Sequence, residues 1–183
     1  MTLPDAKPAK DSPGTPERLW EAAWQALGRL GTQTEVRVTI AKPKPKSGGG
    51  VIGELITVGV YQGAEGDLFV TGFGPVVDAT LWDFVAECSL RTGGATPVAT
   101  QPTEKSPEDY AWEAAWVAAT TLRRDALVRV RFRGEEFVAE AIVIGTGMGP
   151  ARVGYSAKGE DASAALYALS KVCRARYDER IAS

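Results

Sequence analysis

The sequence predicts an α+β protein of two tandem α-β-β-β-α repeats, each with a three-stranded antiparallel sheet and its helices on one face of that sheet. The first observation is a recurrence: the motif Trp-Glu-Ala-Ala-Trp occupies residues 20–24 and returns at 112–116. The same separation places Val-Arg-Val at 36–38 on Val-Arg-Val at 128–130. The second observation is that each copy begins with helical periodicity and continues with strand-like alternation. Matches that recur in one order indicate an internal duplication.

Two segments rich in proline or glycine separate the repeats from the rest of the chain. Residues 1–16 hold four prolines, and we expect a disordered leader there. Residues 92–107 have no apolar periodicity and predict a linker. The repeats then cover residues 17–91 and 108–183. A longer loop of prolines and glycines at 42–50 accounts for a slip in register between the copies after their first strands.

Each repeat opens with a helix whose apolar residues recur at the spacing of one helical face. This face holds Trp20, Trp24 and Leu27 in the first copy and Trp112 and Trp116 in the second, so we expect the tryptophans in the core. Three strands and a closing helix should follow in each copy. The expected ranges are 35–40, 51–61, 67–73 and 77–90 in the first copy, and 128–133, 136–145, 151–156 and 160–176 in the second.

The composition excludes several classes of function. The chain has 21 Lys and Arg against 23 Asp and Glu, which excludes a polybasic protein. It has no His and only two Cys, which excludes imidazole-dependent hydrolase triads, His-containing zinc sites and four-thiolate metal sites. No paired carboxylates and no set of base and nucleophile stand out. We therefore expect no catalytic residue, no metal and no cofactor.

The location of the protein is predicted from what its sequence lacks. The first residues have no apolar core of a signal peptide, and no stretch reaches the ~18 apolar residues of a membrane span. Cys88 and Cys173 lie in apolar helical patterns. We expect a cytoplasmic protein with reduced, buried cysteines and no membrane contact; a disulfide between the two cysteines is the alternative.

The second strand of each repeat is apolar on both sides. In the second copy, Phe137, Ala139 and Ala141 alternate with Val138 and Ile142. A strand that is apolar on both sides is usually covered on both sides. Because the helices cover one face, we expect the sister repeat, by intramolecular packing, or a second chain, in a homodimer, to cover the other.

The closing segment of the second repeat carries a family resemblance. Within residues 154–169, Gly154, Ser156 and Lys158 are followed by paired alanines at 164–165 and by Ala-Leu at 168–169. Together with the α-β-β-β-α order, this pattern resembles the double-stranded-RNA-binding domain. The resemblance implies RNA binding through lysines at the start of the closing helix and through a loop between the first two strands.

The chain departs from that family at the residues that grip phosphates. Ala157 and Asp161 stand where the family has lysines, so only Lys158 remains of the basic cluster. The turn at 133–136 is short and acidic, whereas the first repeat has a longer loop with lysines but no lysine in its closing helix. Each copy therefore lacks part of the family's grip on RNA.

The candidate binding residues are cations of the second repeat and of the long loop in the first. Alternation along the strand at 128–133 places three arginines on the sheet face opposite the helices, where guanidinium groups can contact phosphates. The alternative is that these arginines pair with Glu135, Glu136, Glu140 and acids across the interface. The candidate nucleic-acid-binding residues are Arg129, Arg131, Arg133, Lys158, Lys171, Arg174, Lys42, Lys44 and Lys46.

Two functions follow from these residues. The first is a non-catalytic protein that binds double-stranded RNA or DNA, mainly through phosphate contacts, on a duplicated and degenerate scaffold like the double-stranded-RNA-binding domain. The alternative is a protein–protein interaction or dimerisation module that has lost nucleic-acid binding. The family resemblance favours the first, and the acidic pI of about 5.3 and the broken lysine cluster favour the second.

Overall fold

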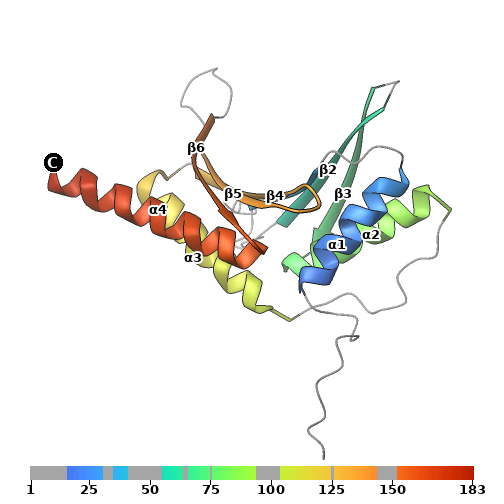
Figure 1. The fold of residues 1–183 in the computed structure, drawn as a ribbon, viewed down its shortest axis with the longest axis horizontal. Helices are drawn as coiled ribbons and strands as arrows, with labels where there is room; N and C mark the ends of the chain where they lie inside the picture. Colours follow the sequence, from blue (N-terminus) through green and yellow to red (C-terminus); the bar gives the residue numbers. More distant parts are fainter. Residues whose placement is uncertain are drawn as a thin grey trace, which may run out of the picture.

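The computed structural model describes residues 16–30, 35–40, 55–63, 66–74, 76–93, 104–124, 126–143 and 152–183. Figure 1 shows their arrangement. The elements in chain order are α1 (Pro16–Arg29), β1 (Glu35–Ile40), β2 (Leu55–Gly63), β3 (Gly66–Gly74), α2 (Val77–Arg91), α3 (Pro107–Leu122), β4 (Ala126–Phe132), β5 (Phe137–Val143), β6 (Arg152–Gly159) and α4 (Ala162–Ala182). The predicted α+β class is confirmed. We call α1 to α2 the first half and α3 to α4 the second half.

The strands form one continuous antiparallel sheet of six strands in the order β3-β2-β1-β4-β5-β6. This differs from the prediction of a separate three-stranded sheet in each half, because β1 of the first half pairs with β4 of the second. A strand at the edge of a sheet leaves backbone N–H and C=O groups unpaired. The pairing of β1 with β4 satisfies these groups on both strands and joins the halves into one sheet.

The β1–β4 pairing has a symmetric register. Val38 lies opposite Val130, and Val36 and Ile40 lie opposite Phe132 and Val128. Val38 and Val130 also occupy the same place in the two Val-Arg-Val segments. Each strand therefore presents the same apolar positions to the other, in opposite directions, about the Val38–Val130 pair.

One hydrophobic core lies between the sheet and the helices. It takes buried side chains from all four helices and from one face of the strands, including Val36, Val38, Val128 and Val130, which are fully buried. In each half the two helices lie side by side, α1 with α2 and α3 with α4. The helices therefore cover one face of the sheet, and we call the opposite face the outer face.

The tryptophans of the opening helices meet at this core. The Trp20 ring of α1 packs edge-on against Phe132 and Phe137 of the second half, with centroids 6.3 and 5.5 Å apart. Trp20 and Trp112 are each 1% exposed, which confirms their predicted burial. Trp24 and Trp116 are partly buried at the margin of the core. The first helix thus packs against strands of the second half and helps to hold the two halves together.

Two glycines let the closing helices lie close to the sheet. A Cβ atom on Gly72 of β3 would lie 2.4 Å from the backbone oxygen of Thr80 in α2, and one on Gly159 of β6 would lie 2.3 Å from the backbone nitrogen of Ala165 in α4. Both contacts are shorter than any side chain tolerates. The two halves therefore use the same device to seat a helix on an edge strand.

The structure corrects three further expectations. The second half does not cover the outer face of the first; it extends the same sheet sideways, because the free strand edges pair instead. The closing helix α4 continues beyond residue 176 to Ala182. Cys88 and Cys173 are buried and free, so the alternative of a disulfide is wrong.

Within the described ranges, no helix is both long and apolar enough to span a lipid bilayer.

Candidate binding surface on the outer face of the sheet

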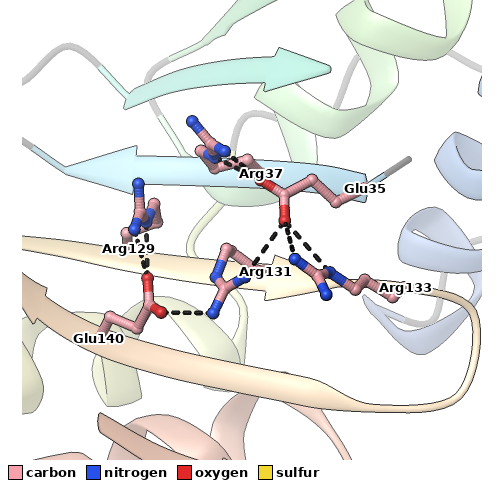
Figure 2. A network of polar contacts seen from close by, with 6 residues as sticks. All are labelled: Glu35, Arg37, Arg129, Arg131, Arg133 and Glu140. Atoms are coloured by element: carbon pink, nitrogen blue, oxygen red, sulfur yellow. Dashed lines mark hydrogen bonds and ion pairs between the residues drawn. The ribbon is translucent and has the colours of Figure 1, made fainter. Parts of the chain in front are cut away.

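Six charged side chains gather on the outer face where the two halves join. Register places Arg37 of β1 opposite Arg131 of β4, and Arg129 of β4 opposite Glu140 of β5. Their neighbours in the strands point to the core, so strand alternation turns these side chains outward. Figure 2 shows them lying across β1, β4 and β5. The group, which we call the arginine cluster, consists of Glu35, Arg37, Arg129, Arg131, Arg133 and Glu140.

Glu140 is the carboxylate of the cluster that comes from the second half. Its side chain is only 4% exposed. Arg129 donates to its Oε2 from Nε at 2.7 Å and from Nη2 at 2.6 Å. Arg131 donates to its other oxygen from Nη2. A nearly buried carboxylate is tolerable here because two guanidinium groups replace the water it has lost.

Glu35 is the carboxylate that comes from the first half. Arg37 donates to it from Nε at 2.9 Å, Arg133 from Nε and Nη2 at 3.3 Å, and Arg131 from Nη1 at 3.4 Å. Burial alone would raise the pKa of Glu35, but the hydrogen bond and charge of Arg37 and the charge of Arg131 bring it below its ordinary value. Glu35 is therefore ionised at neutral pH.

Arg131 connects the two carboxylates and so connects the two halves. Its Nη1 and Nη2 atoms contact Glu35 and Glu140, whereas its Nε atom is buried and has no hydrogen-bond partner among the described residues. Four guanidinium groups face two carboxylates, which leaves a net charge of +2 on the cluster. Arg133 is the most exposed member, with 63% of its side chain accessible.

The other predicted binding residues do not join this cluster. Lys158 lies on β6 and pairs with Glu136 at 2.6 Å, and both side chains are well exposed. Lys171 and Arg174 are exposed on α4, which covers the opposite face of the sheet. Lys42, Lys44 and Lys46 lie outside the described residues. The predicted cations that the structure describes are thus divided between two layers of the molecule.

The N-terminus of α4 is capped by the side chain of Asp161. Asp161 caps the helix and accepts a hydrogen bond from the backbone nitrogen of Ala164 at 2.6 Å. A free helix N-terminus attracts phosphate through its N–H groups and its dipole. The Asp161 carboxylate takes this place.

A second group of buried carboxyls was missed by the sequence analysis. Glu108, in the first turn of α3, is 2% exposed. It accepts hydrogen bonds from the indole nitrogens of Trp20 at 3.1 Å and of Trp112 at 3.0 Å. Burial raises the pKa of Glu108 to about 7, against the lowering effect of the two indoles and with a further rise from the charges of Asp78 and Asp109.

Asp109 ties the start of α3 to the start of α2. Its carboxylate accepts hydrogen bonds from the backbone nitrogen of Ser106 at 2.7 Å and from that of Val77 at 3.0 Å. Burial, and the charge of Asp109, raise the pKa of the neighbouring Asp78 to about 6. The sequence signal for this arrangement is Ser-Pro-Glu-Asp at 106–109, which has the spacing of a capping box. These contacts are structural, since they connect three helices of the core.

The described part of the chain holds no group of three or more His, Cys, Asp or Glu side chains arranged for a metal ion. A hollow of about 460 Å³ lies between α4, β6 and the end of α3, and Tyr155, Arg176 and Arg180 are among its lining residues. Arg176 pairs with Glu179, and Arg180 contacts the backbone oxygen of Leu122.

No family model matches this chain, and neither a curated protein nor a solved structure is significantly similar to it.

Proposed function

We propose that this chain is a non-catalytic protein-binding module that docks a partner on the outer face of its sheet. The observation that carries the proposal is the arginine cluster: four guanidinium groups and two nearly buried glutamates on the face of the sheet opposite the described helices. A concentrated, prearranged set of charges on one face is typical of an interaction surface, where it selects the partner and orients it.

The symmetric register of β1 and β4 supports an origin of this surface by duplication. In the proposal, an ancestral α-β-β-β-α unit was doubled, and the two copies pair through equivalent strands about Val38 and Val130. Such an isologous contact is how two identical units meet. The duplicated scaffold resembles the double-stranded-RNA-binding domain only in element order and in the closing segment of the second half.

The free cysteines support a location in the cytoplasm, which is part of the proposal. Burial raises the pKa of the Cys88 thiol to about 12 and that of Cys173 to about 11. Such thiols are poorly reactive and behave as small apolar core residues. They are compatible with a reducing compartment.

Nucleic-acid binding is the second candidate, favoured by the net positive charge of the cluster. Three features weaken it: the arginines are paired with Glu35 and Glu140, Asp161 caps the start of α4, and the other described candidate cations on α4 lie on the opposite layer. Phosphate binding would show a steep loss of affinity with salt. An anisotropy titration against duplex RNA and duplex DNA, begun at ~50 mM salt, measures this directly.

Selection from a displayed peptide library on the immobilised protein tests the proposal. Recovered peptides are then compared between the wild-type protein, an Arg37→Glu/Arg133→Glu variant and an Arg176→Glu control on the helical layer. We expect peptides whose binding is lost in the double variant and kept in the control. If every recovered peptide binds the double variant as well as the wild type, the outer face is not the docking surface.

A further inference from the structure

We propose that the outer face recognises an acidic polypeptide segment, whose carboxylates bind the guanidinium groups of Arg37 and Arg133 at the arginine cluster. This inference rests on the proposed function and specifies the chemistry of the partner.

The first argument is the number of donors that the cluster leaves unused. A guanidinium group has five N–H donors, and each arginine of the cluster places only two of its nitrogen atoms in contact with Glu35 or Glu140. Two glutamates therefore do not saturate four arginines, and the exposed donors of Arg37 and Arg133 stay open to water or to the acceptor groups of a partner.

The second argument is the chemistry that the cluster already recognises. Its own acceptors are carboxylates: Glu140 takes two donors from Arg129, and Glu35 takes two from Arg37 and two from Arg133. In each of these three pairs, Nε and Nη2 of the arginine converge on a single carboxylate oxygen, and such charge-assisted hydrogen bonds are stronger than neutral ones. Because Glu35 and Glu140 are nearly buried and hold the arginines in place, the outward donors are preorganised for further carboxylates.

The third argument concerns which members a partner can reach. Arg133 has 63% of its side chain exposed and Arg37 has 29%, against 22% for Arg131. Arg37 and Arg133 both contact Glu35, so they flank one carboxylate across the β1–β4 junction. A segment that lies across this junction can place acidic side chains beside both of them, whereas Arg131 stays committed to the internal glutamates.

The observations favour an acidic polypeptide over a nucleic acid. A polyphosphate backbone repeats its charge at short, regular intervals and is gripped by a continuous track of cations. Here two carboxylates stand between the arginines, and the pair of Lys158 and Glu136 beside them adds no net charge. A polypeptide can place two or three carboxylates where the donors are and neutral residues beside Glu35 and Glu140.

A binding titration with defined peptides tests the inference. The probes are a fluorescently labelled twelve-residue peptide that alternates Glu with Ser and a matched peptide that alternates Gln with Ser, measured by anisotropy at about 50 mM salt and again at higher salt. The proteins are the wild type, the Arg37→Gln/Arg133→Gln variant and an Arg176→Gln control, which removes an exposed arginine from the helical layer. The circular dichroism spectrum and melting temperature confirm that each variant is folded.

We expect the acidic peptide to bind the wild type about tenfold more tightly than the Gln peptide, to lose that advantage in the double variant and to keep it in the control. Equal binding of both peptides to the wild type, or unchanged binding of the acidic peptide to the double variant, overturns the inference. If the double variant does not fold, the test is NMR of the wild type, in which the acidic peptide is added and changes in backbone amide chemical shifts are mapped. Changes in β1 and β4 support the inference. Changes confined to α4 overturn it.

The outcome separates this inference from the proposed function. Displayed peptides that depend on Arg37 and Arg133 but carry no excess of Asp and Glu would overturn the acidic partner and leave the docking surface intact. Duplex RNA that binds through the same arginines, with no binding of the acidic peptide, would overturn both in favour of the nucleic-acid candidate. Selected peptides that are acidic and sensitive to both substitutions support both.

Discussion

Each of the two junctions between the halves contains a buried carboxyl group, and the pKa values of these two groups shift in opposite directions. On the outer face, Glu35 is surrounded by arginines, and its pKa falls below the ordinary value in spite of burial. On the helical side, burial and the charges of Asp78 and Asp109 raise the pKa of Glu108 to about 7, although the indole N–H groups of Trp20 and Trp112 lower it. The comparison teaches that the partner, and not burial alone, decides whether a buried acid is charged.

The two regions should therefore respond differently to mutation and to pH. The outer face depends on charge, so its stability should be lost when an arginine is removed or when the pH falls far enough to protonate Glu35. The helical junction depends on aromatic packing and a neutral carboxyl, so it should weaken as the pH rises. The following predictions run from the largest expected effect to the smallest.

Replacing Trp20→Ala should have the largest effect, because it removes a buried ring of the helical junction together with one donor to Glu108. We expect a loss of about 3–5 kcal/mol in the free energy of unfolding. Urea titration measures it, with Tyr110→Ala on the exposed side of α3 as the matched control, expected to change stability by less than about 0.5 kcal/mol. A loss below about 1 kcal/mol for Trp20→Ala would show that this ring does not hold the halves together.

Replacing Arg131→Met should damage the outer face, because both Glu35 and Glu140 lose a shared guanidinium group. Breaking a largely buried ion pair from one side destabilises a protein by about 3 kcal/mol. The measurement is urea unfolding at neutral pH, beside Arg176→Met, whose pair with Glu179 is exposed. Equal stabilities of the two variants would contradict the role assigned to Arg131.

Replacing Glu108→Gln should change the pH dependence of stability. The carboxyl pKa is about 7 in the folded chain and near 4.5 when unfolded, so the unfolded state releases its proton first and stability falls as the pH rises from about 4.5 to about 7. Gln cannot ionise and still accepts from both indoles. Above about pH 7 the variant should be more stable than the wild type, on the order of 2 kcal/mol.

The test is a series of thermal or urea unfolding curves between about pH 5 and pH 8. The advantage of Glu108→Gln should shrink toward the acidic end, where the wild-type carboxyl is also neutral. Asp78, with a pKa of about 6, leaves a smaller dependence in the variant. A variant that is less stable than the wild type at pH 8 would mean that the indoles require the ionised form.

Replacing Lys158→Ala should have the smallest effect. Its pair with Glu136 is exposed on β6, and such pairs contribute less than about 0.5 kcal/mol. The same urea titration measures it and gives the scale against which Arg131→Met is compared. A loss above about 1 kcal/mol would indicate that the charges at the rim belong to the arginine cluster.

The element types were predictable from the sequence, and the way the sheet is joined was not. Tryptophans and alanines at helical spacing and the alternation of Val36 and Val38 with Arg37 specify which face of each element is buried. Periodicity does not specify which strand edges meet, because edge pairing uses backbone groups that every residue carries. The prediction that the sister repeat covers the outer face therefore failed, because β1 and β4 pair instead; cover of that face by a second chain stays a prediction.

The candidate site was predictable in part for the same reason. Alternation predicts Arg129 and Arg131 on the outer face, and Glu140 is among the alternative partners that the sequence predicts for them. Glu35 was not named, since it reaches Arg131 only through the β1–β4 pairing. Glu108 was missed because one of its donors, Trp20, stands 88 residues away in the chain. Both missing partners come from contacts between the halves.

Cross-strand nuclear Overhauser effects between β1 and β4 test most directly the claim that both halves build one sheet and, with it, one outer face. In uniformly labelled protein, backbone proton contacts should appear between Val38 and Val130, between Val36 and Phe132 and between Ile40 and Val128, with slow amide exchange in both strands. Absence of these contacts, together with fast exchange in β1 and β4 as in edge strands, would contradict the account.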